Sequence, residues 1–174
     1  MHTLLPNIAR VMDSALANIC EYMADEFEID ATVKQLVSGE ITALTLREMT
    51  SIIGIGGAVD LFMAFSFEQS LIQALYDKMT EGMEISEEEA AEMKNATAAE
   101  IINIIAGHCT TDLQDMDSEI ISITPPTVLN LVKTVPKMER AIFHLRTITT
   151  ASGDLDIYLI GPRELFSDHL DYVK

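Results

Sequence analysis

Two polar side chains stand three residues apart in a stretch that is otherwise apolar or small. The stretch runs over residues 98–107, and Glu100 and Asn103 are its polar members. On an α-helix this spacing places a carboxylate and a carboxamide on one face, as a narrow polar stripe. Ala96 and Gly107 extend the face by one turn each way, and both are small enough to let another molecule approach. The pattern predicts a site at Glu100 and Asn103, with Ala96 and Gly107 as partner-binding positions.

The residue types alone leave the role of each polar side chain open. A carboxamide such as Asn103 accepts a hydrogen bond from water and donates one to an anionic oxygen without titrating, so it suits the positioning of water. The same side chain is compatible with a satisfied core amide, since a buried unpaired amide costs about 1–3 kcal/mol. Glu100, taken alone, is more typical of a solvated surface acid.

The charge of the chain excludes some classes of partner. The formal net charge is -17 over 174 residues. Nucleic acids and anionic membranes attract positive surfaces, so the sequence argues against both as partners. The simplest interpretation of the acidity is solubility.

The composition predicts one cytoplasmic domain over residues 1–174. The beginning of the sequence lacks the pattern of a signal peptide, and the apolar run around residues 61–67 is too short to cross a bilayer. The two cysteines are expected to be reduced. His108 and Cys109 are adjacent but lack further ligands at suitable spacing, so no metal site is predicted for this chain.

Hydrophobic periodicity and turn signals predict alternating helices and strands. Ser86 and Glu89 have the spacing of a capping box, so residues 87–89 are interpreted as helix-capping rather than metal-ligating. The double proline at 125–126 predicts the end or edge of a strand. The expected helices span residues 7–27, 68–79, 86–108 and 162–172, the expected strands span 41–55, 58–67, 119–123, 140–149 and 154–160, and residues 54–57 are expected to form a hairpin turn.

An internal similarity relates the two halves of the chain. The segment at 57–64 resembles that at 153–160, and a predicted helix follows each. The expected fold is α+β, with two pseudo-symmetric helix–strand–strand–helix halves, about 1–82 and 83–174. The halves share one mostly antiparallel sheet with long helices packed on one side. In this alignment Asn18 corresponds to Asn103, whereas Ala15 replaces Glu100, so one copy of the stripe is complete and the other is broken.

Three short segments together resemble a known family. They are Glu100-x-x-Asn103 in an apolar helix, Gly54-Ile-Gly-Gly57 before a strand, and Ile123-Thr-Pro-Pro-Thr-Val128 after the stripe helix. In these segments the chain is similar to the CheC/CheX/FliY phosphatases, and the last two are specifically similar to CheX. The resemblance runs from the first predicted helix to about Tyr158.

The resemblance implies hydrolysis of the aspartyl-phosphate of a CheY-type response regulator in chemotaxis. It implies that Asn103 positions the attacking water and that Glu100 pairs with a lysine of the regulator. It also implies a homodimer, no cofactor of its own, and a divalent metal such as Mg²⁺ on the regulator. One departure is Ala96, because related motifs often carry Asp or Ser four residues before the Glu, and the change bears on the rate.

A second hypothesis from the sequence is a non-catalytic adaptor that binds a response regulator or a flagellar switch component. Ala96 and the broken first copy are compatible with it. A small-molecule enzyme is poorly supported, because the glycines at 54–57 lie between two predicted strands rather than opening a helix as a phosphate-binding loop does.

Overall fold

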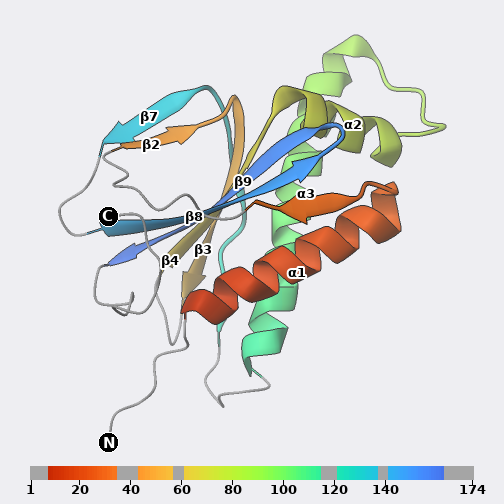
Figure 1. Ribbon diagram of the computed structural model, residues 1–174. Coiled ribbons are helices and arrows are strands. Elements are labelled where there is room, and N and C mark those ends of the chain that lie inside the picture. Colours follow the sequence, from red (N-terminus) through yellow and green to blue (C-terminus); the bar gives the residue numbers. More distant parts are fainter. Residues whose placement is uncertain (1–7, 35–42, 57–60, 115–120, 137–140, 163–174) are drawn as a thin grey trace, which may run out of the picture.

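The computed structural model describes residues 8–34, 43–56, 61–114, 121–136 and 141–162, which form helices and antiparallel strands (Figure 1). The helices are α1 (Ile8–Phe27), α2 (Gln69–Met79) and α3 (Glu87–Gln114), and the strands are β1 (Ala31–Val33), β2 (Ala43–Leu46), β3 (Met49–Gly56), β4 (Leu61–Phe67), β5 (Ser122–Ile123), β6 (Thr127–Asn130), β7 (Lys133–Pro136), β8 (Ala141–Thr150) and β9 (Gly153–Pro162).

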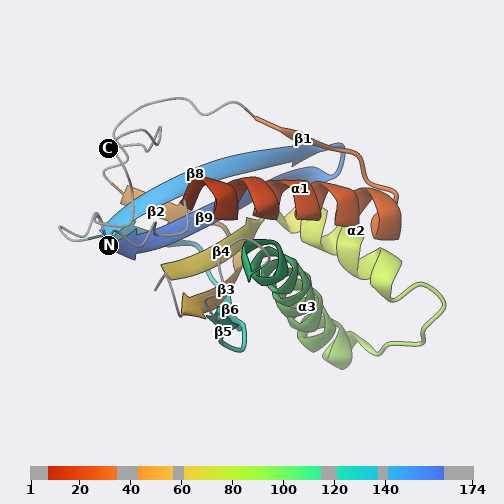
Figure 2. The same ribbon diagram turned by 90° about the horizontal axis from the view of Figure 1, so that it is seen from below.

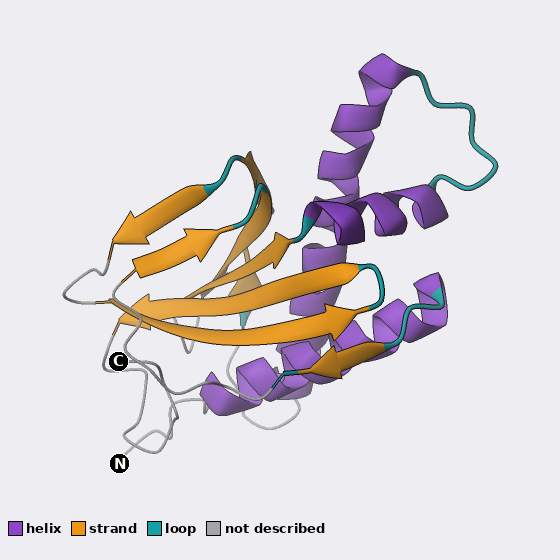
Figure 3. Ribbon diagram, turned by 45° about the horizontal axis from the view of Figure 1, so that its top comes forward, coloured by secondary structure: helices purple, strands orange, loops and turns teal. Residues whose placement is uncertain are grey.

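The main sheet has the strand order β1-β8-β9-β4-β3-β5, and β6 also pairs with β3. Every pairing among the described strands is antiparallel. Figures 2 and 3 show α1 and α3 on one face of this sheet. The separate two-stranded ribbon β2–β7 packs Leu44 and Leu46 near Phe143 and Tyr158 of the other face. The predicted α+β class, with one mostly antiparallel sheet and long helices on one side, is confirmed.

The main core lies between the helices and the sheet. Alternate residues of the central strands, such as Met63 and Phe65 of β4, are fully buried there. The period of two along the strand directs these side chains to the helix-covered face. Ile101 and Ile105 of α3 complete the layer from above. Burying a side chain of this size contributes about 1.5–3 kcal/mol, so α3 is held mainly by its apolar face.

Several local predictions from the sequence are confirmed. α1 and α2 begin and end within a residue of the expected positions among the described residues. The capping box is present: the Glu89 N–H donates to Ser86 Oγ at 3.3 Å, and the Ser86 N–H donates to Glu89 Oε2 at 3.2 Å. The strands β8 and β9 form the expected pair.

The expected strand over 41–55 is wrong as a single element. It breaks at Arg47 into β2 and β3, and β2 leaves the main sheet. The Arg47 N–H donates to Ser66 Oγ at 2.7 Å, and its Nε donates to Asp156 Oδ2 at 2.7 Å. At Arg47, hydrogen bonds to the side chains of Ser66 and Asp156 therefore take the place of backbone pairing with a neighbouring strand. A linear hydrophobic pattern carries no sign of that exchange.

Other boundaries also differ from the expectation. α3 continues to Gln114 rather than ending near His108, because Leu113 is still buried in the core. The short strands β1, β6 and β7 were not expected. β3 continues through residues 54–56 of the expected hairpin turn, and residue 57 lies outside the described part. The expected helix at 162–172 also lies outside it, apart from Pro162, which belongs to β9. The division into halves near residue 82 stays a prediction.

Gly153, the first residue of β9, is required by its backbone conformation and its surroundings. Its φ is +134°, and an added Cβ would lie 2.6 Å from Ser70 Oγ. We expect Gly153→Ala to lower the free energy of unfolding by about 1–3 kcal/mol, measured by chemical denaturation. Gly107→Ala is the matched control, since nothing lies within 4 Å of its added Cβ and the position is helical. That change is expected to stabilise the protein by about 0.5–1 kcal/mol; equal effects of the two substitutions would contradict this account.

Candidate functional site

The site helix α3 combines a buried face with an opposite face of small and polar residues. Its buried side chains contact the sheet and α1. Because a helix repeats every 3.6 residues, this burial directs Ala96, Glu100 and Asn103 outward, and all three are exposed. The buried residues of α3 are Thr97, Ala98, Ile101, Ile102, Ile105, Ala106, Cys109 and Leu113.

The exposed face forms one side of an open pocket of about 600 Å³, here called the Glu100–Asn103 pocket. Its α3 side comprises Ala96, Ala99, Glu100 and Asn103, and its other side comprises residues 123–126. The structure therefore brings together three of the four predicted site residues. Gly107 is half-buried and does not line the pocket.

The side chains of Glu100 and Asn103 are available to another molecule. Asn103 is exposed, so its interpretation as a satisfied core amide is wrong. Among the described residues, the hydrogen bonds and ion pairs of the structure do not include either side chain. Their charge and hydrogen-bonding capacity remain free for a partner.

The second wall of the pocket is a segment that the sequence analysis treated as structural. Thr124, Pro125 and Pro126 lie between β5 and β6 and face α3 across the pocket. The double proline does end β5, as expected. Its place in the pocket follows from the tertiary fold, which carries this edge of the sheet alongside α3.

Tyr22 of α1 is close enough to the site to respond to its charge. Burial, together with the carboxylates of Glu26 and Glu100, raises the pKa of Tyr22. The phenol therefore stays neutral at physiological pH and keeps its proton for donation. Tyr22 could not be predicted from the sequence, because only the crossing of α1 and α3 brings it near Glu100.

Asn18 of α1, unlike Asn103 of α3, is hydrogen-bonded within the fold. The Asn18 amide donates to Asp112 Oδ2 at 3.0 Å and to Ser14 Oγ at 3.1 Å. Ser14 Oγ in turn donates to Asp112 Oδ2 at 2.5 Å. Asn18 thus joins α1 to the C-terminal part of α3, rather than presenting a free amide to a partner.

A family model described as "Chemotaxis phosphatase CheX" matches residues 49–139, just over half of the chain, including α3 and both walls of the pocket. The chain belongs to the CheX family. A search among curated proteins finds no match.

Solved structures share the fold of this chain. The chemotaxis protein CheX from Desulfovibrio desulfuricans matches with a TM-score of 0.72 at 14% identity, over 86% of this chain and 97% of that one. A chain of the CheX–CheY–BeF3–Mg²⁺ complex from Borrelia burgdorferi matches with a TM-score of 0.60 at 19% identity, over 91% of this chain and 99% of that one. FliY from Thermotoga maritima matches with a TM-score of 0.58 at 14% identity, over 95% of this chain and 93% of that one. At these identities the likeness shows the fold.

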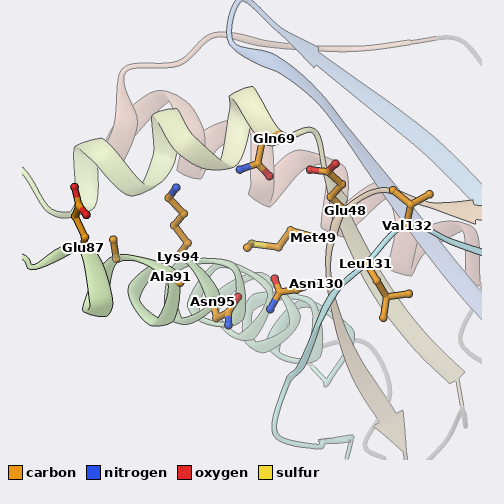
Figure 4. Close-up of a pocket in the computed structure, with 11 residues that line it drawn as sticks. Glu48, Met49, Gln69, Glu87, Ala91, Lys94, Asn95, Asn130, Leu131 and Val132 are labelled. Carbon is orange, nitrogen blue, oxygen red and sulfur yellow. The ribbon is translucent and has the colours of Figure 1, made fainter.

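A second, larger pocket of this CheX-family chain lies near the start of α3 (Figure 4). It has a volume of about 680 Å³. Lys94 projects into it, and its Nζ lies 5.5 Å from the ring centroid of Tyr76. Because it lacks Glu100 and Asn103, we place the candidate site in the smaller pocket. The second pocket is lined by Glu48, Met49, Gln69, Glu87, Ala90, Ala91, Lys94, Asn95, Asn130, Leu131 and Val132.

His108 and Cys109 lie on different faces of α3. His108 is exposed, whereas Cys109 is buried, and burial raises the pKa of its thiol to about 11. In the described part of the chain, no group of three or more His, Cys, Asp or Glu residues is arranged to hold a metal ion. The helices described there include none with the length and apolar character needed to cross a membrane.

Measurements of stability can test the contrast between the hydrogen-bonded Asn18 and the exposed Asn103. We expect Asn18→Ala to lower the free energy of unfolding by about 1 kcal/mol, because Ser14 and Asp112 lose their shared partner. Asn103→Ala is the matched control and should change it by less than about 0.5 kcal/mol, as an exposed substitution. Chemical denaturation measures both. An equal loss in the two variants would mean that Asn103 also serves the fold.

Proposed function

We propose that this CheX-family chain is a protein phosphatase that hydrolyses the aspartyl-phosphate of a CheY-type response regulator, helping to terminate a chemotaxis signal. The observation that carries the proposal is the exposed Glu100–Asn103 pair in one pocket. The CheX–CheY complex of Borrelia burgdorferi, which shares the fold, supports a CheY-like partner.

The reaction demands little covalent help from the phosphatase. An acyl phosphate is already activated, so water needs only to be placed in line with the bond that breaks. A water oxygen forms the new bond to phosphorus, and the bond between phosphorus and the aspartyl oxygen breaks. The products are inorganic phosphate and the regulator's free carboxylate, and the excess proton of the water passes to solvent or phosphate.

Asn103 suits the task of positioning that water. Its carboxamide oxygen accepts a hydrogen bond from the water, and its NH₂ group donates to a phosphoryl oxygen. The neighbouring positions Ala96 and Ala99 carry only methyl groups, so the backbone of α3 can approach the regulator's phosphorylation site closely. Holding a water in a near-attack position contributes several kcal/mol to a lower barrier, of the order found for other oriented reactants.

Glu100 suits docking, one turn from Asn103 on the same face. A carboxylate at this place can pair with a lysine near the regulator's phosphoryl group, and the pair would fix the rotation of α3 against the partner. A divalent metal such as Mg²⁺, expected on the regulator, would supply charge compensation at the phosphoryl oxygens. This chain is proposed to hold no cofactor.

The first test is the Asn103→Ala variant. Loss of the carboxamide should reduce catalysed phosphate release from a phosphorylated regulator by about 100-fold, because the water is no longer oriented. Binding to the regulator activated with beryllofluoride should be largely kept. Release is followed by phosphate detection, and affinity by titration calorimetry.

Asn18→Ala is the matched control for this test. It removes the corresponding amide of α1, which is hydrogen-bonded to Asp112 and lies outside the pocket. We expect wild-type turnover per folded molecule. Wild-type turnover by Asn103→Ala would refute the assignment of the water-positioning group.

A second variant, Glu100→Gln, tests docking by charge. It keeps the shape and one hydrogen-bonding oxygen but removes the charge, so the KM for the phosphorylated regulator should rise by about tenfold or more. Added salt should weaken wild-type binding more than binding of the variant. Glu88→Gln is the control, since Glu88 is an exposed carboxylate in the first turn of α3, outside both pockets. Equal changes in the two variants would indicate a general effect of net charge.

The competing function is a non-catalytic adaptor for a response regulator or a flagellar switch component. It predicts measurable binding to the activated regulator without faster phosphate release from the wild type. That outcome would make the pocket a docking surface alone. The expected homodimer is a separate proposal, and sedimentation at high concentration tests it.

A further inference from the structure

The proline wall of the Glu100–Asn103 pocket is held by an unusual strand pairing. Ile55 pairs with Ile123, and Ile52 pairs with Thr127. Two residues of β3 lie between these pairs, whereas the opposite segment 124–126 has three. The extra residue is a bulge in the edge of the sheet, and bulges of this kind commonly re-aim side chains beside functional sites.

Thr124 supplies the hydrogen bonds that the prolines cannot. Its N–H donates to Gly54 O at 2.9 Å, and its Oγ1 accepts from the Gly54 N–H at 2.9 Å. In a regular antiparallel pair a backbone carbonyl would accept this second bond. Pro125 and Pro126 have no N–H with which to pair, so the Thr124 side chain anchors the wall directly before they begin.

Gly54 completes this anchor by having no side chain. An added Cβ would lie 3.0 Å from Thr124 Cγ2 and 3.2 Å from Thr124 Oγ1. These distances are tight for a methyl group, so the Thr124 side chain must shift by a few tenths of an ångström to admit one. The position of the wall relative to Asn103 therefore depends on the close approach of the Thr124 side chain to the backbone of Gly54.

We infer that Thr124 and Gly54 are positioning residues, which set the proline wall at the distance from Glu100 and Asn103 that the phosphorylated regulator requires. The inference rests on the proposed phosphatase function and adds the determinant of fit opposite the site helix. The prolines carry no catalytic group, so the wall contributes shape. Because their rings are rigid, the wall is already ordered before the partner binds, which favours affinity.

Thr124→Val tests the inference, because it replaces the hydroxyl by a methyl group of similar size. Valine can neither accept from the Gly54 N–H nor donate to Pro125 O, as the Thr124 hydroxyl does at 2.9 Å and 3.2 Å. We expect the KM for the phosphorylated regulator to rise about three- to tenfold from this loss, with kcat within about twofold of wild type. The affinity for the beryllofluoride-activated regulator should fall by the same factor. Amide exchange at Gly54, followed by NMR, should accelerate because its acceptor is lost.

Three further variants separate positioning from a general effect on the sheet. Thr124→Ser keeps the hydroxyl and should restore wild-type KM. Gly54→Ala adds no group able to touch the partner, and it should raise KM as Thr124→Val does by displacing the wall. Ser122→Ala is the control. Ser122 Oγ donates to Gly56 O of β3 at 3.3 Å, two residues along from Gly54, and Ser122 lies outside the pocket. This variant should behave as wild type.

The outcomes are distinct from those that test the phosphatase itself. If the wild type does not accelerate phosphate release, the proposed function fails. If it does, and Thr124→Val keeps wild-type KM and affinity, the inference is overturned. A rise in KM for Ser122→Ala equal to that for Thr124→Val also overturns it. Thr124 is exposed, so its replacement removes no core packing. If Thr124→Val nevertheless folds poorly, the less bulky Thr124→Ala replaces it in the test. Thr124→Ala must then give the same rise in KM, or the inference fails.

Discussion

The structure depends on burial of one face of α3. That helix packs its aliphatic side chains against the sheet and α1, and this packing fixes its rotation about its own axis. A rotation by even one residue, about 100°, would expose core side chains and bury polar ones. Glu100 and Asn103 are therefore aimed by residues such as Ile101, Ile102 and Ile105, none of which touches a partner. The geometry of the site is a by-product of core packing.

The opposite wall is fixed in a different way. It lies at the edge of a sheet, where neither proline can take part in a regular ladder. Two hydrogen bonds between Thr124 and Gly54 hold it, next to the partly buried Ile123, which packs against the core. The pocket thus has one wall set by the core and one wall set by a sheet edge. Small changes at the edge can therefore alter the width of the pocket without disturbing the packing of α3.

The sequence was informative where structure is encoded locally. The period of α1, the Ser86–Glu89 capping box and the Glu100–Asn103 stripe each depend on residues within one or two turns, and the structure contains all three. It was uninformative where distant side chains decide the outcome. Arg47 ends a strand because Ser66 and Asp156, which lie elsewhere in the chain, offer better partners.

The proline wall shows the same limit in the candidate site. The sequence identified residues 123–128 as a distinctive segment, but its function as a pocket wall depends on pairing with β3, some seventy positions earlier in the chain. The bulge adds one residue between two registers, and hydrophobic alternation cannot reveal a shift of that kind in so short a segment. Tyr22 was missed for a similar reason, since only the crossing of two helices brings it near Glu100.

The two asparagines illustrate how one helix pattern can serve two purposes. Asn103 stands on a face with small neighbours and remains free, whereas Asn18 stands beside Ser14 and opposite Asp112 and is hydrogen-bonded to both. An amide that already satisfies its donors within the fold gains little by turning to a partner, because it must first break those bonds. Ala15, the residue of α1 matched to Glu100, carries no charge either. The difference between the two helices therefore lies in the hydrogen bonding of their amides, because only the Asn103 amide of α3 is free of partners among the described residues.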